Sequence, residues 1–309
     1  MLYLVMLACT AGDDTRTVAE DTGPDGAGYG EIVPFRAATF NIDWLSPRDS
    51  DRDDVVPRNS RDREMIRTLI TEYDLSLVAL QEIEGAGAIS ALGFDDSWSW
   101  VAGDSGWSLN PALLYRSDRF SVTDVFEVEL PGQSDGYRDP LVAVVEHTTG
   151  LSFVVVVVHL AAYDDDASSS LRQGQATSLH GWLSDDLAGR VGADLAERVM
   201  LLGDFNDTVG GINDRYPSLS VFDEDEYWRI ATKQVDGAST VYFSSVIDHA
   251  ILSPEMTARW TGESSETGCN VIYHDAIDPW ASYGGGYGDE QNISSHRPVT
   301  LGFNAGTLD

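Results

Sequence analysis

The chain has 309 residues and a formal net charge of −32, because 51 acidic residues face only 19 basic ones. A hydrophobic content of 42% is enough for a large core and excludes a wholly disordered chain. The charge opposes non-specific binding to polyanions, so a nucleic-acid substrate would need a divalent cation and local arginines to reverse the field inside a cleft.

The first eight residues, Met1–Ala8, are almost wholly apolar, and Cys9 follows at once. This run is too short to span a bilayer. It is similar to the end of a bacterial lipoprotein signal peptide, in which the cysteine becomes the lipidated first residue. The basic segment of such a peptide is missing, which a start codon assigned too late would explain. We expect residues 1–8 to be a signal segment and Cys9 to be lipidated; a disordered hydrophobic start is the alternative.

Residues 9–34 predict a disordered acidic tether, because 10–30 is rich in Asp, Gly and Thr and has few large apolar residues. The tether would hold a domain of residues 35–304 off a surface. The expected location is extracytoplasmic, as a bacterial outer-surface lipoprotein or secreted protein that contacts membrane only through a lipidated Cys9. With Cys9 modified, Cys269 would have no partner within the chain, so no disulfide is expected.

From residue 35 onward, strand-like and helix-like segments alternate. The expected strands are 35–42, 75–80, 112–115, 122–128, 141–147, 153–158, 199–202, 239–243, 246–252 and 299–303. A helix is expected over 60–73, with Asn59 or Ser60 as its cap, and a second one carries apolar residues at helical spacing over 171–187. The valine-rich strand 153–158 should be buried on both faces.

Six short motifs combine a probable strand with groups that bind metal or move protons. They are TFNID (39–43), LQE (80–82), VVVHL (156–160), LGDFND (202–207), VIDH (246–249) and SSHRPV (294–299). An apolar run that stops on Asn, Asp, Glu or His places the polar group at the carboxyl edge of a sheet, where open α/β sheets carry their sites. Six such motifs in order are hard to explain as core packing.

The order and content of these motifs resemble the endonuclease/exonuclease/phosphatase superfamily, the metal-dependent phosphoesterases that include deoxyribonuclease I-like nucleases. The resemblance covers roughly Phe35 to Phe303. It implies a four-layer α/β sandwich, with two mixed β-sheets packed face to face and helices outside. It also implies a hydrolase that uses Mg²⁺, with Mn²⁺ or Ca²⁺ as the alternative ions.

Hydrolysis of a phosphate ester needs a cation, an oriented water and stabilisation of developing charge. Glu82 is the leading candidate for metal ligation, since it would stand at a strand end and hard cations bind oxygen; an ordinary exposed acid is the alternative. Asp43 lies two residues after Asn41, so both could face one side of an extended segment. By the resemblance, Asp43 is a metal-side acid and Asn41 orients a metal ligand or the phosphate.

GDFND is the most specific single motif. Asp204 and Asn206 are two residues apart and would point the same way, with Phe205 turned into the core. In the resembling family this Asp orients or activates the attacking water, and the Asn contacts phosphate. Asp207 is interpreted as a loop acid.

Two histidines complete the candidate set. His159 ends the valine run, where it is either a core histidine or, by the resemblance, a donor to the scissile phosphate. His296 would pair with Asp248, which would hold its ring and favour the imidazolium form; this pairing is carried over from the family. Arg172 is a candidate phosphate contact, placed at a helix start. His249 would point to the opposite strand face from Asp248 and is interpreted as structural.

The last motif departs from the family. Its members normally read Ser-Asp-His, whereas this chain reads Ser294, Ser295, His296. Serine removes a charge, so metal affinity should fall and the metal should shift toward Asp43 and Glu82. The loss could also mark a degenerate enzyme.

Deoxyribonuclease-like hydrolysis of DNA or another nucleic acid is the first function we expect. The alternatives are a sphingomyelinase-type phosphodiesterase acting on a phospholipid or small molecule, and a catalytically dead surface protein that keeps the fold for binding. A monomer is expected. The loops 46–57, 132–139 and 277–293 would select the substrate, and aromatic residues in the last one could stack on bases or dip into lipid.

Overall fold

The computed structural model describes residues 32–47, 58–106, 109–130, 138–213, 215–235, 237–240, 244–262, 269–273 and 293–306. The expected signal segment, Cys9 and the tether up to residue 31 lie outside these residues, as do most of the three expected substrate loops. By its contacts the chain divides into Met1–Gly30 and Glu31–Asp309, and all described residues belong to the second unit. Among the helices in the described ranges, none is both long and apolar enough to cross a membrane.

Two six-stranded sheets form the centre of the domain. The first has the order β11 (Cys269–Val271), β12 (Val299–Ala305), β1 (Val33–Leu45), β2 (Leu75–Ile83), β4 (Asn110–Arg116), β3 (Trp98–Ala102). The second has the order β5 (Phe120–Glu127), β6 (Leu141–His147), β7 (Ser152–His159), β8 (Val199–Asp204), β10 (Asp248–Leu252), β9 (Arg229–Ile230). Both sheets are mixed, because β1–β2 and β7–β8 are parallel and the other neighbours antiparallel.

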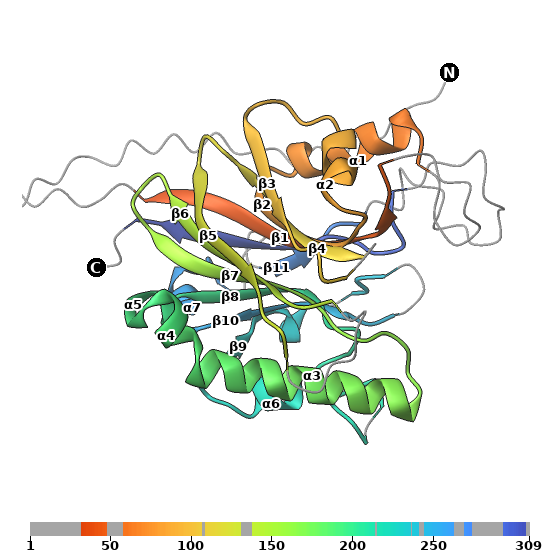
Figure 1. Ribbon diagram of the computed structural model, residues 1–309, viewed down its shortest axis with the longest axis vertical. Helices are drawn as coiled ribbons and strands as arrows, with labels where there is room; N and C mark the ends of the chain where they lie inside the picture. Colours follow the sequence, from red (N-terminus) through yellow and green to blue (C-terminus); the bar gives the residue numbers. More distant parts are fainter. Residues whose placement is uncertain are drawn as a thin grey trace, which may run out of the picture. The chain divides into compact units, whose positions relative to one another are not determined.

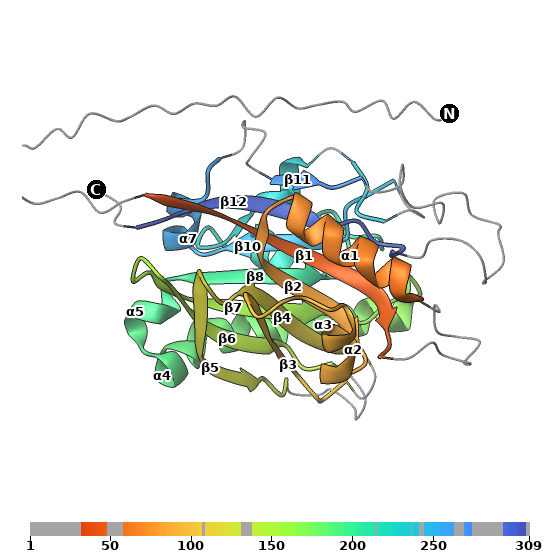
Figure 2. The same ribbon diagram turned by 90° about the horizontal axis from the view of Figure 1, so that it is seen from above.

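Helices cover the outer faces of both sheets (Figure 1). The first sheet carries α1 (Ser60–Glu72) and α2 (Ala86–Ala91); the second carries α3 (Asp166–Asp185) and α6 (Ser220–Asp223). The shorter helices are α4 (Leu187–Val191), α5 (Ala193–Ala196), α7 (Pro254–Arg259) and the 3₁₀ helix η1 (Ala231–Gln234). Figure 2 shows α1 lying along the first sheet. This is the four-layer α/β sandwich predicted from the sequence.

The central core lies between the two sheets. Side chains such as Leu77 and Leu113 from the first sheet pack in one buried cluster with Val155 and Leu202 from the second. Separate clusters join each sheet to its own helices. The alternating strand positions therefore bury both faces of each sheet, which leaves the strand ends as the place where polar side chains collect.

Most of the predicted elements form, with different ends. Helix α1 begins after Asn59, whose side chain accepts hydrogen bonds from the backbone N–H groups of Arg61 and Asp62, at 2.8 and 3.1 Å. Strand β7 is buried on both faces, as its valines predict. The strand expected over 239–243 does not form in its described part, where Thr240 only makes an isolated bridge to His296; residues 241–243 lie outside the described residues.

A glycine sets the spacing between strands β7 and β8. A methyl group on Gly203 would collide with the carbonyl oxygen of Val158 on β7, whereas one on Gly174 in the middle of α3 would meet no atom within 4 Å. We expect Gly203→Ala to lower the free energy of unfolding by about 1–3 kcal/mol, because neighbouring strands must move apart. The control, Gly174→Ala, should raise it by up to about 1 kcal/mol. Urea unfolding of both variants measures these changes. A change in the free energy of unfolding with the same sign in both variants would contradict the prediction.

Candidate active site

The register of the second sheet brings three polar side chains into one row. His159 lies opposite Asp204 in the parallel β7–β8 pair, and Asp248 lies opposite Asp204 in the antiparallel β8–β10 pair. All three are buried, at the edge where β7 and β8 end. In the other sheet, Asn41 lies opposite Gln81 of β2, one residue before Glu82. The polar residues of the motifs therefore lie close together, as the sequence predicts. Asp248 begins β10 and His296 precedes β12, so both lie at or ahead of the amino ends of these strands, rather than at carboxyl ends as the pattern suggested.

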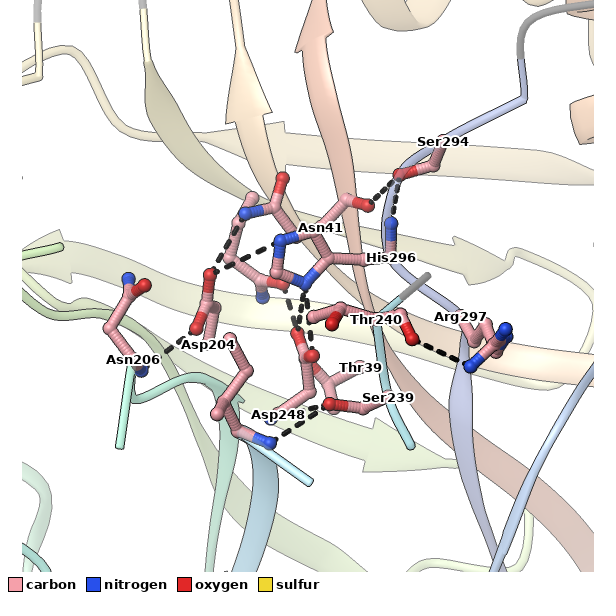
Figure 3. A network of polar contacts seen from close by, with 12 residues as sticks. Thr39, Asn41, Asp204, Asn206, Ser239, Thr240, Asp248, Ser294, His296 and Arg297 are labelled. Carbon is pink, nitrogen blue, oxygen red and sulfur yellow. Dashed lines mark hydrogen bonds and ion pairs between the residues drawn. The ribbon is translucent and has the colours of Figure 1, made fainter. Parts of the chain in front are cut away.

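Asn41 joins the two sheets through its side chain. Its Nδ2 donates to Glu82 Oε1 at 3.1 Å and to Asp204 Oδ2 at 3.0 Å, and its Oδ1 accepts the backbone N–H of Asp43 at 2.9 Å. Figure 3 shows this amide pointing toward Asp204. Because the Asn41 side chain is fully buried, it fixes one carboxylate of each sheet relative to the other. This position suits the orienting role that the family resemblance implies for Asn41.

His296 contacts Asp248 directly. Its Nδ1 lies 3.2 and 3.0 Å from the two carboxylate oxygens of Asp248, and its Nε2 lies 3.9 Å from Asp204 Oδ2 (Figure 3). The backbone N–H of His296 donates to Ser294 Oγ at 2.9 Å, and that hydroxyl donates to the carbonyl oxygen of Asn41 at 2.7 Å. The imidazole is thus held at both its ring and its backbone, with Nε2 turned toward Asp204.

The pair His296–Asp204 is arranged electrostatically for proton transfer. Burial alone would lower the pKa of His296, but the carboxylates of Asp248 and Asp204 outweigh it and raise that pKa to about 10. Burial, followed by the charge of Asp248, raises the pKa of Asp204. His296 is therefore an imidazolium at neutral pH, while Asp204 binds a proton more readily than an exposed aspartate. Both pKa values are raised, and that of Asp204, at about 7, lies near the pH at which a general base works best.

His159 lies between the two carboxylates that Asn41 joins. Its Nε2 is 3.7 Å from Glu82 Oε1 and 3.7 Å from Asp204 Oδ2. Burial, together with the charges of Arg138 and His296, lowers the pKa of His159 well below its usual value, so the ring is neutral. Its Nδ1 is buried without a hydrogen-bond partner among the described residues. His159 therefore belongs to the site, and its role as a donor to the phosphate stays a prediction.

Two carboxylates, Glu82 and Asp43, offer oxygen ligands beside this row. Burial and then the charge of Asp43 raise the pKa of Glu82, whose Oε2 accepts the backbone N–H of Trp44 at 3.0 Å. Adjacent carboxylates that repel each other are what a hard cation stabilises, so this donor set fits a divalent metal.

A second cluster of potential ligands overlaps the histidine site. Single ligand atoms of Asp204, Asp248 and His296 lie within 4.8 Å of one another. Both Asp248 oxygens, however, already face the ring Nδ1 of His296. An imidazolium repels a cation, so we favour Glu82 and Asp43 as the metal side.

Backbone strain concentrates at this site. In the described part of the chain, six non-glycine residues have positive φ, and four of them lie here: Asp43 at 54°, Trp44 at 57°, Glu82 at 63° and Asn206 at 52°. Such conformations cost free energy and persist where the surrounding structure imposes them, commonly at functional sites. The sequence predicted that Asp43 and Asn41 face the same side of an extended segment. The positive φ of Asp43 breaks that extended geometry.

The GDFND turn is held in place by its own side chains. The backbone N–H of Asn206 donates to Asp204 Oδ1 at 2.8 Å, and Asn206 Nδ2 donates to the carbonyl oxygen of Leu160 at 3.1 Å. Phe205 is fully buried, as predicted. Asp207 lies in the loop after β8, as interpreted, and it is buried there. It accepts hydrogen bonds from the N–H and hydroxyl of Ser218, at 2.9 and 2.7 Å.

Arg172 does not have the geometry of a phosphate contact, which corrects the sequence prediction. Helix α3 begins at Asp166, so Arg172 lies in its second turn rather than at its start. Its side chain is fully buried, and its Nη1 donates to the carbonyl oxygens of Ala161 and Tyr163, each at 2.8 Å.

His249 is structural as expected, because its ring contacts the Thr232 hydroxyl at 2.6 Å and the Asp207 carbonyl at 2.9 Å.

Sequence reasoning missed Arg138. Its Nη2 donates to the carbonyl oxygen of Leu160 at 3.4 Å, and its charge is among the smaller influences that lower the pKa values of Glu82 and His159. It therefore brings a positive charge to an acidic site. The only sequence signal was its place in the loop 132–139, which was expected to select the substrate.

Ser295 stands where the family resemblance of the sequence leads us to expect an aspartate. It is 5% exposed and follows Ser294, whose hydroxyl contacts the Asn41 backbone. This neutral side chain therefore belongs to a segment that contacts β1 at Asn41.

The sequence also matches a known protein family. A model of the Endonuclease/Exonuclease/phosphatase family matches residues 38–289. None of the curated proteins compared with the sequence matches it.

Several solved structures share the fold. An endonuclease/exonuclease/phosphatase family protein of Bacteroides thetaiotaomicron has a TM-score of 0.62 and 17% identity, covering 90% of this chain and 100% of that one. The mannosyl-6-phosphatase Bt3783 of the same species has 0.59 and 16%, covering 86% and 98%. D. rerio TDP2 complexed with a single-strand DNA product has 0.60 and 15%, covering 88% and 99%. At these identities the similarity concerns the fold.

Proposed function

Because this chain belongs to the endonuclease/exonuclease/phosphatase family, we propose that it is a divalent-metal-dependent phosphodiesterase whose first substrate class is DNA or another nucleic acid. Hydrolysis of phosphoric esters is the general activity of this family. The observation that carries the proposal is the buried Asn41 amide, which ties Glu82 to Asp204 beside the Asp248–His296 pair. A core without catalytic function has no need of four ionisable groups held together at a strand edge.

Glu82 and Asp43 would hold the metal, Mg²⁺ first and Mn²⁺ or Ca²⁺ as alternatives. Bound there, the ion would supply stabilisation of negative charge on the phosphoryl oxygens. The support for this assignment is the oxygen donor set and the raised pKa of Glu82, caused by burial and by Asp43.

The protein's own groups divide the remaining tasks. Asp204, oriented by Asn41, accepts a proton from the attacking water. His296, kept charged by Asp248, stabilises the phosphate oxygens and the departing oxygen. Neutral His159 donates a hydrogen bond to the scissile phosphate, and the Asn206 amide contacts it from the adjacent turn.

Nucleic acid is preferred as the substrate class on two grounds. A fold relative, D. rerio TDP2, was solved with a single-strand DNA product. Arg138 and His296 bring positive charge into a site on an otherwise strongly acidic chain, which lets a polyanion approach locally although the whole molecule repels it.

A substrate panel tests this function. Double-stranded DNA, single-stranded DNA, RNA, sphingomyelin and a chromogenic phosphodiester are each incubated with magnesium, manganese and calcium. Cleavage of a nucleic acid with one of these ions supports the proposal. Cleavage of sphingomyelin alone would favour the lipid phosphodiesterase, and a wild type that binds no metal and cleaves nothing would favour the binding protein.

We also propose that the protein is extracytoplasmic and tethered through a lipidated Cys9. The proposal rests on the apolar run 1–8 ending at a cysteine before an acidic spacer. Intact-mass measurement on membrane fractions should find a chain that lacks residues 1–8 and carries lipid on Cys9. A soluble, full-length chain with unmodified Cys9 would refute it.

A further inference from the structure

Tyr163 is an exposed aromatic residue in a strained backbone conformation. It lies in the loop between β7 and α3, has a φ of 76°, and is 81% exposed. A bulky side chain at such a φ is a rare outlier, since glycine, asparagine and aspartate account for most residues found there. Tyr163 buries little surface in return, so packing of its own ring does not explain the conformation.

Two side chains of helix α3 hold the loop in this strained conformation. Arg172 Nη1 donates to the carbonyl oxygens of Ala161 and Tyr163, each at 2.8 Å, and Gln175 Oε1 accepts the backbone N–H of Ala161 at 2.8 Å. Both side chains are buried. Together they clamp the peptide groups on both sides of Ala161, which is how a strained loop persists in a folded protein. Tyr163 is thereby held out toward solvent.

The clamped loop adjoins the active site. The N–H of Leu160 donates to the carbonyl oxygen of Asp204 at 3.0 Å, and its own carbonyl accepts Asn206 Nδ2 at 3.1 Å. Tyr163 is three residues further on, so its Cα lies within about 11 Å of that of Leu160. Arg172, which holds the Tyr163 carbonyl, has its Nε 3.9 Å from Asp207 Oδ2 on the other side.

The geometry points to Tyr163 as a substrate-contacting residue, whose ring stacks on a planar base next to the scissile phosphate. This inference rests on the proposed function and names the part of the substrate that the site would recognise. Four other non-glycine residues with positive φ lie at the active site that this loop adjoins. A chain with a net charge of −32 gains no general attraction for a polyanion, whereas stacking on an exposed aromatic ring supplies affinity without charge and tolerates any base.

Two chromogenic esters with the same leaving group test this contact. Thymidine 5′-(p-nitrophenyl phosphate) carries a base, and methyl p-nitrophenyl phosphate carries none. For Tyr163→Gly we expect KM to rise at least about fivefold for the thymidine ester, since an aromatic platform is lost, and to stay at the wild-type value for the methyl ester. Tyr163→Phe keeps the ring and should keep the wild-type KM for both.

A stability measurement accompanies the kinetics. Tyr163→Gly should unfold at a higher urea concentration than the wild type, because glycine adopts positive φ without strain. Asp74→Gly is the matched control: Asp74 has a φ of 50° but precedes β2 at the end opposite Glu82. It should leave both KM values unchanged.

Three results would overturn the inference. They are an unchanged KM for the thymidine ester in Tyr163→Gly, an equal rise for both esters, and a Tyr163→Gly variant less stable than the wild type. A wild type that cleaves neither ester would overturn the proposed function and this inference with it, whereas cleavage of both with no effect at Tyr163 would leave the function standing.

Discussion

His296→Ala is expected to lower the turnover number for a phosphodiester by about 10²-fold or more, and Asp204→Ala by a similar factor. His296 is held by both carboxylate oxygens of Asp248, with its Nε2 3.9 Å from Asp204 Oδ2. In the proposed mechanism, removing the imidazole takes away the positive charge that acts on the substrate. Removing the carboxylate takes away the group proposed to accept the proton of water.

The control for these variants is His180→Ala. His180 also pairs with an aspartate, Asp225, at 2.8 Å, but it lies on α3 at a partly exposed position. Its loss should leave turnover near the wild-type value. Steady-state kinetics with magnesium or manganese, with circular dichroism to verify folding, measures all three variants. Full activity of the double variant His296→Ala/Asp204→Ala would be incompatible with the proposed roles.

Ser295→Asp is expected to tighten magnesium or manganese binding by about tenfold or more, because an added carboxylate ligand strengthens a site for a hard cation. Activity should be at least retained. Without metal, the variant should be less stable than the wild type, because the family resemblance implies that another acid then joins Glu82 and Asp43. The wild type should bind the metal weakly.

Calorimetric titration of both forms measures the difference. Ser184→Asp, which adds the same charge at an exposed position of α3, serves as the control and should bind metal as the wild type does. Equal affinities of Ser295→Asp and the wild type would mean that residue 295 lies away from the cation.

The sequence could predict the fold and much of the site because both depend on local pattern. An apolar strand that ends on a polar residue fixes which edge that residue occupies, and His159 and Asp204 end β7 and β8 in this way. Asp248 instead begins β10 and reaches the same edge because β10 pairs antiparallel with β8. The two-sheet architecture followed from the resemblance of the six motifs, and the family match over residues 38–289 and the two six-stranded sheets confirm it.

Other features depend on tertiary contacts that leave no local pattern. The phosphate role predicted for Arg172 assumed that it stood at a helix start, but α3 begins six residues earlier, at Asp166, and turns the guanidinium toward buried carbonyl groups. The positive φ of Glu82 could not be predicted from the sequence, because glycine is the usual signal of this conformation. At Glu82 the surrounding contacts impose it instead. Arg138 was missed because nothing in its neighbours indicates that the chain returns there to Leu160.

The most direct test of the whole account is the rate of hydrolysis of bis(p-nitrophenyl) phosphate by the full chain, first with magnesium or manganese and then in excess chelator. We predict turnover with metal, loss of turnover to the uncatalysed background in chelator, and recovery when metal is added back in excess. The ion is expected to bind beside Glu82 and Asp43. The groups proposed to act on the water and the phosphate, such as Asp204 and His296, are expected to need that ion for turnover. Full activity in excess chelator would contradict the account.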